Sequence, residues 1–111
     1  MRIATWNVNS VKARKERLLA FLGRHAPDVV CLQELKTEAA GFPFEELRAA
    51  GYESAVLGQK TYNGVAILSR EAPADVETGF GDGGDESQAR LIAATVGGLR
   101  VASAYIPNGK E

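Results

Sequence analysis

Apolar residues recur along the first third of the chain with the spacings of a strand, a helix and a second strand. Residues 2–7 form a short apolar run, and residues 28–34 (DVVCLQE) form a continuous one, the pattern of a strand buried on both faces in a parallel arrangement. Between them, apolar positions at helical spacing predict a helix over residues 11–25. Ser10 is suited to cap its N-terminus, and Gly23 and Pro27 are suited to end it.

The remaining apolar segments predict one short helix and then a series of strands. The helix covers residues 42–50, and Gly51 stops it. The strands alternate with Gly, Asn and Pro turns, and they are expected at residues 52–58, 64–70, 74–78, 90–96 and 99–106. Gly97 and Gly98 join the last two strands as a hairpin. We therefore expect an α/β fold, in which a mixed sheet carries helices on one face.

A sheet built from all these strands has more surface than the helices can cover. A single sheet needs a second layer to bury each apolar face, so one face is left without a partner. We infer from this imbalance that the chain is the front half of a larger fold, or one half of an assembly.

Length and composition are those of an ordinary globular protein. The 111 residues suggest one domain, and the net charge of −1 provides no global positive field that would indicate nucleic acid. The single cysteine, Cys31, lies in an apolar run, which fits a small buried side chain in a reducing compartment. We expect no secretory signal, because the start MRIATW has no apolar segment of that kind, and no apolar stretch reaches the ~20 residues that cross a bilayer. We therefore expect a soluble cytoplasmic protein with no membrane association.

Two polar side chains follow the first two predicted strands. Asn7 ends the first strand and Glu34 ends the second. A right-handed crossover makes these strands parallel, so both residues leave the sheet at one edge, where ligands bind in folds of this type. Mg²⁺ is commonly held by one or two carboxylates together with waters and substrate phosphates, so a carboxylate beside an amide suits a magnesium site. The alternative is that Glu34 is an exposed acid and Asn7 forms a turn.

Three further side chains lie near strand ends. Lys36 could pair with Glu34 and orient its carboxylate, or it is a solvated loop lysine. Tyr105 and Asn108 flank a rigid proline turn, and both can donate hydrogen bonds to a phosphate oxygen. A tyrosine at a strand end is otherwise half-buried packing.

Other residues that often carry chemistry have simpler explanations. The turn after the first strand, NVNS, lacks the glycines of a dinucleotide-binding motif or a P-loop. His25, the single histidine, lies at the far end of the first helix, away from Asn7 and Glu34, where it complements the helix dipole. The acidic stretch GDGGDE lacks the ligand spacing of an EF-hand and is interpreted as a turn.

Five short motifs occur in an order that resembles one family of nucleases. They are WNVNS, LQELK, YNGVAILS, ARLIAA and YIPNG, and they extend over nearly the whole chain. The chain resembles the exonuclease III family of apurinic/apyrimidinic (AP) endonucleases, within the endonuclease/exonuclease/phosphatase superfamily. The resemblance implies a DNase I-like four-layer α/β sandwich, with two packed sheets and helices outside. Residues 1–111 would be the N-terminal half of that domain, and the C-terminal half would be absent.

The same resemblance implies an activity, a cofactor and a partner. Members of the family cleave the phosphodiester 5′ to an abasic site and often remove 3′ nucleotides. They use Mg²⁺, for which Mn²⁺ can substitute. The implied partner is double-stranded DNA with abasic sites or 3′ ends, and the implied function is DNA repair.

The motifs also carry over the roles of individual residues. Glu34 matches the metal-binding glutamate, Asn7 matches the asparagine beside the metal and the phosphate, and Tyr105 matches the tyrosine directed at the scissile phosphate. Supporting positions are matched by Lys36, Asn9 and Asn108, and positions that touch the DNA backbone are matched by Lys12, Tyr62 and Arg90.

Part of the family pattern is missing from residues 1–111. The family also uses an Asp-x-Asn pair that orients the attacking water and an Asp-His pair near the C-terminus, and neither occurs. We therefore expect the chain alone to be inactive or nearly so. Two other functions stay open: a non-catalytic protein that binds nucleic acid or a partner, and a phosphatase or lipid phosphodiesterase of the same superfamily.

Overall fold

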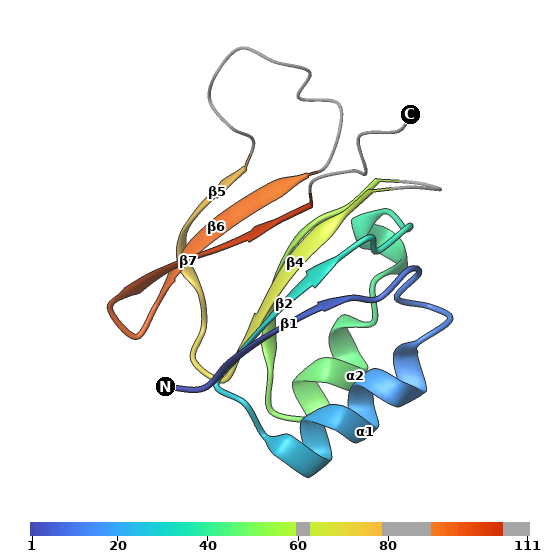
Figure 1. Cartoon of the computed structure of the whole chain (residues 1–111), viewed down its shortest axis with the longest axis horizontal. Helices are drawn as coiled ribbons and strands as arrows, with labels where there is room; N and C mark the ends of the chain where they lie inside the picture. The colour runs from blue at the N-terminus through green and yellow to red at the C-terminus, as the bar shows by residue number, and fades with distance from the viewer. Residues whose placement is uncertain (60–62, 79–89, 106–111) are drawn as a thin grey trace.

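The strands divide into two sheets that pack against each other (Figure 1). The computed structural model describes residues 1–59, 63–78 and 90–105. In this part of the chain the elements are β1 (Ile3–Asn7), α1 (Lys15–His25), β2 (Val29–Gln33), η1 (Ala39–Gly41), α2 (Phe44–Ala49), β3 (Glu53–Leu57), β4 (Val65–Ser69), β5 (Ala74–Thr78), β6 (Leu91–Val96) and β7 (Leu99–Ala104). Apart from η1, which was not predicted, their order agrees with the order predicted from the apolar pattern.

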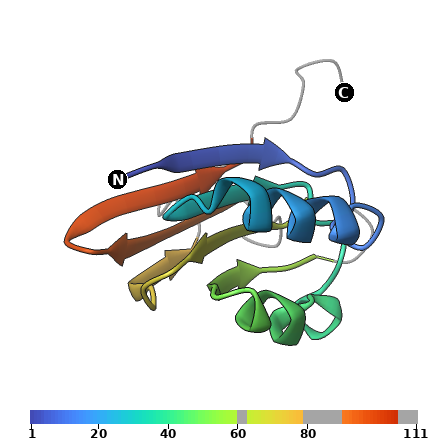
Figure 2. The same cartoon turned by 90° about the horizontal axis from the view of Figure 1, so that it is seen from below.

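The first sheet has four strands in the order β1-β2-β4-β3. β1 and β2 are parallel, with Asn7 opposite Gln33, whereas β4 pairs antiparallel with both β2 and β3. α1 and α2 lie on the same side of this sheet, away from β5, β6 and β7 (Figures 1 and 2). The predicted mixed sheet with helices on one face is therefore confirmed.

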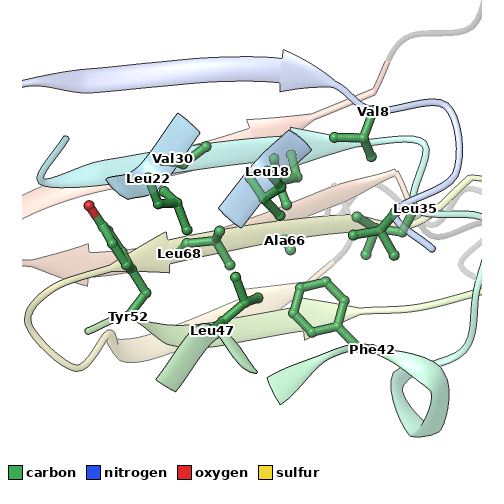
Figure 3. Close-up of a cluster of buried hydrophobic side chains, with 12 residues drawn as sticks. Val8, Leu18, Leu22, Val30, Leu35, Phe42, Leu47, Tyr52, Ala66 and Leu68 are labelled. Atoms are coloured by element: carbon green, nitrogen blue, oxygen red, sulfur yellow. The ribbon is translucent and has the colours of Figure 1, made fainter. Parts of the chain in front are cut away.

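Apolar side chains fill the space between the helices and the first sheet (Figure 3). Leu18 and Leu22 face inward from α1 and Leu47 faces inward from α2, and each is almost fully buried. They belong to one cluster with Val30 and Leu68 of the sheet. Fully burying one such side chain contributes about 1.5–3 kcal/mol, so this cluster holds both helices on the sheet.

The second sheet has three strands in the order β5-β6-β7, and it covers the other face of the first sheet. Alternate residues of β6, Ile92, Ala94 and Val96, are buried in one cluster with Cys31 and Ile67 of the first sheet. The expectation of a single sheet with that face uncovered is therefore wrong. β2 and β4 are apolar on both faces, and after β4 the chain folds across the second face and buries it.

α1 begins later than the sequence predicted. Its first residue is Lys15, and Ser10 does not cap it. The Ser10 hydroxyl instead accepts a 3.2 Å hydrogen bond from the backbone N–H of Ala13 and caps the turn over residues 11–14. Asn9 and Ser10 both have positive φ, 47° and 89°, because backbone hydrogen bonds hold this segment against the end of β2 before the helix begins.

α1 ends at His25, the last residue of the predicted range, but Gly23 does not help to end it. Gly23 lies inside the helix, which runs to His25, and Ala26 takes the left-handed C-terminal position that glycine usually occupies. α2 ends at Ala49, and Gly51 follows with a φ of +95°, so the predicted stop is confirmed there. No helix in the described residues is long and apolar enough to span a membrane.

Candidate active site

The carboxyl ends of β1 and β2 bring Asn7 and Glu34 together. The strands are parallel and Asn7 lies opposite Gln33, so the residue after Gln33 leaves the sheet beside Asn7. The side-chain amide of Asn7 donates a 2.9 Å hydrogen bond to Oε1 of Glu34. The carbonyl oxygen of the same amide accepts a 3.1 Å hydrogen bond from the backbone N–H of Asn9. These two bonds fix the orientation of the Asn7 amide and hold one oxygen of the carboxylate.

Glu34 lies in an uncommon backbone conformation. Glu34 and Lys36 have φ values of 58° and 57°, a region that residues other than glycine adopt at a cost of order 1–3 kcal/mol each. Between them Leu35 is fully buried, and its N–H donates a 3.1 Å hydrogen bond to the carbonyl of Gly64. The N–H of Lys36 donates to the carbonyl of Asn63 at 2.9 Å. The backbone carbonyls of Asn63 and Gly64 therefore hold the segment that carries Glu34.

Lys36 approaches the other carboxylate oxygen. Its Nζ lies 3.8 Å from Oε2 of Glu34, and the two side chains are 34% and 22% exposed. This distance is at the long end for an ion pair and the pair is partly open to solvent, so its contribution to stability is small. Both oxygens of Glu34 keep lone pairs for a further ligand, since a carboxylate accepts about four contacts.

Tyr105 follows β7 at the same end of the molecule. The Sγ of Cys31 lies 3.8 Å from the carbonyl of Ala102, and the hydroxyl of Ser103 donates a 2.9 Å hydrogen bond to the carbonyl of Leu32. The later residue of β7 thus contacts the later residue of β2. The two strands therefore run in the same direction and end on the same side of the molecule. Tyr105 is half-buried and packs against the cluster between the sheets.

The residues matched to DNA contacts are spread more widely. The carbonyl of Arg90 accepts a 2.8 Å hydrogen bond from the backbone N–H of Tyr105, so Arg90 lies beside Tyr105. Lys12 is exposed on the turn before α1, where it lines a cavity of about 420 Å³ against η1 and the start of α2. Tyr62 and Asn108 lie outside the described residues, as does the acidic stretch GDGGDE.

The described residues offer a small set of metal ligands. They contain no group of three or more histidine, cysteine, aspartate or glutamate side chains that could hold an ion. The donors at the edge are the carboxylate of Glu34 and the amide oxygen of Asn7, and this set fits Mg²⁺ because that ion keeps several waters and binds few protein ligands.

His25 is the last residue of α1, at the C-terminal end of the helix, as the sequence predicted. Its ring packs against the ring of Phe21, with 5.0 Å between the two centroids.

Sequence interpretation missed three residues that shape this edge. Leu35, Asn63 and Gly64 hold the backbone of Glu34, although none of them carries chemistry. The available signal was the Asn-Gly pair, which indicates a turn but does not reveal what the turn packs against.

Comparison with known proteins places the chain in a family. A family model described as "Endonuclease/Exonuclease/phosphatase family" matches residues 4–108. The chain belongs to this family. Exodeoxyribonuclease III of Haemophilus influenzae is 34% identical over 115 residues, which cover 100% of this chain and 43% of that protein. The chain thus spans less than half the length of this curated relative.

Solved structures of family members have the same fold over the described elements. The 3′-5′ exonuclease NExo of Neisseria meningitidis has a TM-score of 0.95 and 46% identity, covering 99% of this chain and 43% of that one. An AP endonuclease of Archaeoglobus fulgidus has a TM-score of 0.89 and 40% identity, covering 96% of this chain and 41% of that one. The predicted resemblance to the exonuclease III family and the predicted DNase I-like α/β fold are therefore confirmed.

Proposed function

We propose that this member of the endonuclease/exonuclease/phosphatase family is the N-terminal portion of a metal-dependent DNA-repair phosphodiesterase. The proposed activity is cleavage 5′ to abasic sites in double-stranded DNA and removal of 3′ nucleotides. The observation that carries the proposal is the hydrogen-bonded arrangement of Asn7 and Glu34, with Lys36 nearby, at the parallel strand ends. Relatives named exodeoxyribonuclease III and AP endonuclease support the substrate class, as does a similar protein, the 3′ phosphatase NExo from Neisseria, whose solved structure is bound to a product DNA hairpin.

Glu34 and Asn7 would hold the divalent ion, Mg²⁺ or Mn²⁺. When bound, the ion would neutralise negative charge on a phosphate at this edge. The Asn7 amide keeps Oε1 of Glu34 in place, and Lys36 approaches Oε2. Asn9 supports the arrangement, because its backbone N–H fixes the orientation of the Asn7 side chain.

Groups on the second sheet would meet the DNA phosphates from the other side. Tyr105 carries a phenol that can donate a hydrogen bond to a phosphate oxygen, and Arg90 beside it supplies positive charge. Lys12 would contact the backbone further along the duplex, as we propose also for Tyr62. Asn108 would support the site from the turn after Tyr105. Contacts of this kind position the duplex without reading its sequence.

We propose that residues 1–111 do not turn over DNA by themselves. Phosphodiester hydrolysis needs an aligned, activated water as well as positive charge at the phosphate. The described residues supply one carboxylate at this edge and no group of three candidate metal ligands. The rest of the machinery would come from sequence that the relatives have and this chain does not match.

A fusion experiment tests the proposal. The chain is joined to the portion of Haemophilus influenzae exodeoxyribonuclease III that it does not align with, and a labelled duplex with one abasic site is incubated with Mg²⁺. We expect incision 5′ to the site by the fusion and a loss of at least 100-fold in the Glu34→Gln variant, since charge-stabilising groups typically contribute 10²–10³ in rate. The chain alone should give no incision.

Three results would contradict parts of the proposal. Strong Mg²⁺-dependent incision by the 111 residues alone would overturn the proposed inactivity. A folded fusion whose incision is unaffected by Glu34→Gln would overturn the role of Glu34. Hydrolysis of inositol phosphates in preference to abasic DNA, in a direct competition, would favour the phosphatase alternative.

A further inference from the structure

The side chain of Gln33 contacts two other strands that lead to the candidate active site. Its Nε2 donates a 3.0 Å hydrogen bond to Oγ1 of Thr5 on β1 and a 3.1 Å hydrogen bond to Oγ of Ser103 on β7. Ser103 in turn donates a 2.9 Å hydrogen bond to the carbonyl of Leu32 on β2. One carboxamide and one hydroxyl thus join β1, β2 and β7.

Each of these strands delivers a site residue shortly after the network. Thr5 comes two residues before Asn7, Gln33 comes directly before Glu34, and Ser103 comes two residues before Tyr105. Two residues of a strand span only about 7 Å and point to the same face. The residues of the network therefore come one or two positions before the proposed metal ligands and the tyrosine in the chain.

The apolar surroundings of the network explain why its hydrogen bonds can fix the position of one sheet relative to the other. The layer between the sheets consists mainly of apolar side chains, among them Val65, Ile67, Ile92 and Val101. Apolar contact is non-directional, so it favours packing of the sheets without selecting how far one slides along the other. Hydrogen bonds need defined distances and angles, and Ser103 is only 1% exposed, so a slide of the sheets would leave its hydroxyl unpaired at a cost.

We propose that Gln33 and Ser103 act as an inter-sheet clamp that sets the position of Tyr105 relative to Asn7 and Glu34. They are positioning residues, because they hold the strands that carry the reactive groups and would touch neither the metal nor the DNA. The inference rests on the proposed function for its purpose, whereas the clamp itself is a property of the metal-free chain.

NMR of the 111-residue chain tests the clamp directly. The protein is labelled with tyrosine carrying ¹³C in the ring, and the signals are assigned with Tyr→Phe variants. We expect Gln33→Met and Ser103→Ala each to move the Tyr105 signal by more than its linewidth. The double variant should move it no further, because both changes break one network. Ser103→Thr, which keeps the hydroxyl, should restore the native signal.

Two internal controls separate positioning from general stability. Ser69 is also fully buried, and its hydroxyl donates to the carbonyl of Glu71, but it lies opposite Val29 at the other end of β2. Ser69→Ala should lower the urea midpoint while leaving the Tyr105 signal in place. Tyr52 is buried and bonded to the carbonyl of Pro27, so its signal should not respond to the clamp variants.

Either of two outcomes overturns the clamp. One is an unchanged Tyr105 signal in the folded Gln33→Met variant, which is informative even if Ser103→Ala fails to fold, since Gln33 is only partly buried. The other is an equal shift in Ser69→Ala. The measurement uses neither metal nor DNA, so a failure of Mn²⁺ to bind at Glu34 would overturn the proposed function and leave this result standing.

Discussion

Asn7 and Glu34 stand 27 residues apart in the sequence and meet through a 2.9 Å hydrogen bond between the Asn7 amide and Oε1 of Glu34. The contact exists because β1 and β2 are parallel neighbours in register, so their carboxyl ends coincide. The carboxylate is held there before any metal or DNA binds. Changes to either side chain can therefore be tested on the free chain.

Replacing Asn7 should separate its two proposed roles, which are to hold the Glu34 carboxylate by a hydrogen bond and to bind the metal ion. Asn7→Ala loses two exposed hydrogen bonds, one to Glu34 and one from the backbone N–H of Asn9, and should lower the free energy of unfolding by about 0.5–1.5 kcal/mol for each. Asn7→Asp puts a like charge beside Glu34 and should destabilise the metal-free chain further. Added Mn²⁺ should offset the loss in Asn7→Asp. Urea unfolding with and without Mn²⁺ measures both effects, and an Asp variant as stable as the parent without metal would contradict the prediction.

The effect of the close approach of Gly64 to Leu35 on stability can be measured by comparing substitutions at two glycines. Gly64 and Gly51 have φ values of +96° and +95°, but an added Cβ meets Leu35 at 2.9 Å in the first case and nothing within 4 Å in the second. Gly51→Ala should cost about 1–2 kcal/mol for the left-handed backbone alone. Gly64→Ala should cost a further ~1–3 kcal/mol for overpacking.

The same pair reports on the candidate site. Gly64→Ala should also weaken Mn²⁺ binding, measured by calorimetry, because it displaces the segment that carries Glu34. Gly51→Ala should leave Mn²⁺ affinity unchanged. Equal unfolding free energies in the two variants would show that the contact with Leu35 is readily relieved.

Leu35 and Leu68 offer a second matched comparison. Both are fully buried in the helix-side cluster, so Leu35→Ala and Leu68→Ala should each lower the free energy of unfolding by about 2–5 kcal/mol. Only Leu35 lies between Glu34 and Lys36. Mn²⁺ affinity at a temperature where both variants are folded should therefore fall in Leu35→Ala alone, and a similar fall in Leu68→Ala would contradict the assignment.

Cys31 should make the protein less stable at alkaline pH. Burial between the sheets raises the pKa of the Cys31 thiol above its ordinary value. Below the unfolded pKa, near ~8.5, both states are protonated and the contribution to stability is fully present. As pH rises above that value, the unfolded thiol ionises first and stability is lost by up to about 1.4 kcal/mol per pH unit.

A cysteine-free variant checks the alkaline effect. Unfolding free energies at pH 7 and pH 10 should differ less in Cys31→Ala than in the parent, because other titrating groups are common to both. Iodoacetamide should also react with the native thiol far more slowly than with the urea-unfolded one. A native thiol that reacts at the unfolded rate would mean that the sheets do not protect it.

The sequence by itself determined the elements and one edge of the candidate site. Apolar spacing identified β1, α1 and β2, and the handedness of the crossover placed Asn7 beside Glu34, since both rules depend on short stretches of chain. The Gly97 and Gly98 turn likewise predicted the hairpin in which Val96 pairs with Leu99. The five motifs predicted the family.

Only the tertiary structure decided how these elements combine. The same alternation of β6 suits one sheet or two, and the choice depends on the apolar second face of β2 and β4, which is distant in sequence. Ser10 does not cap the predicted helix, because the segment after β1 is hydrogen-bonded to the end of β2 and the helix begins only at Lys15. The contact of Leu35 with Gly64 and the bond between Gln33 and Ser103 are also non-local. Local pattern selects the type and face of an element, whereas its partners follow from packing of the whole chain.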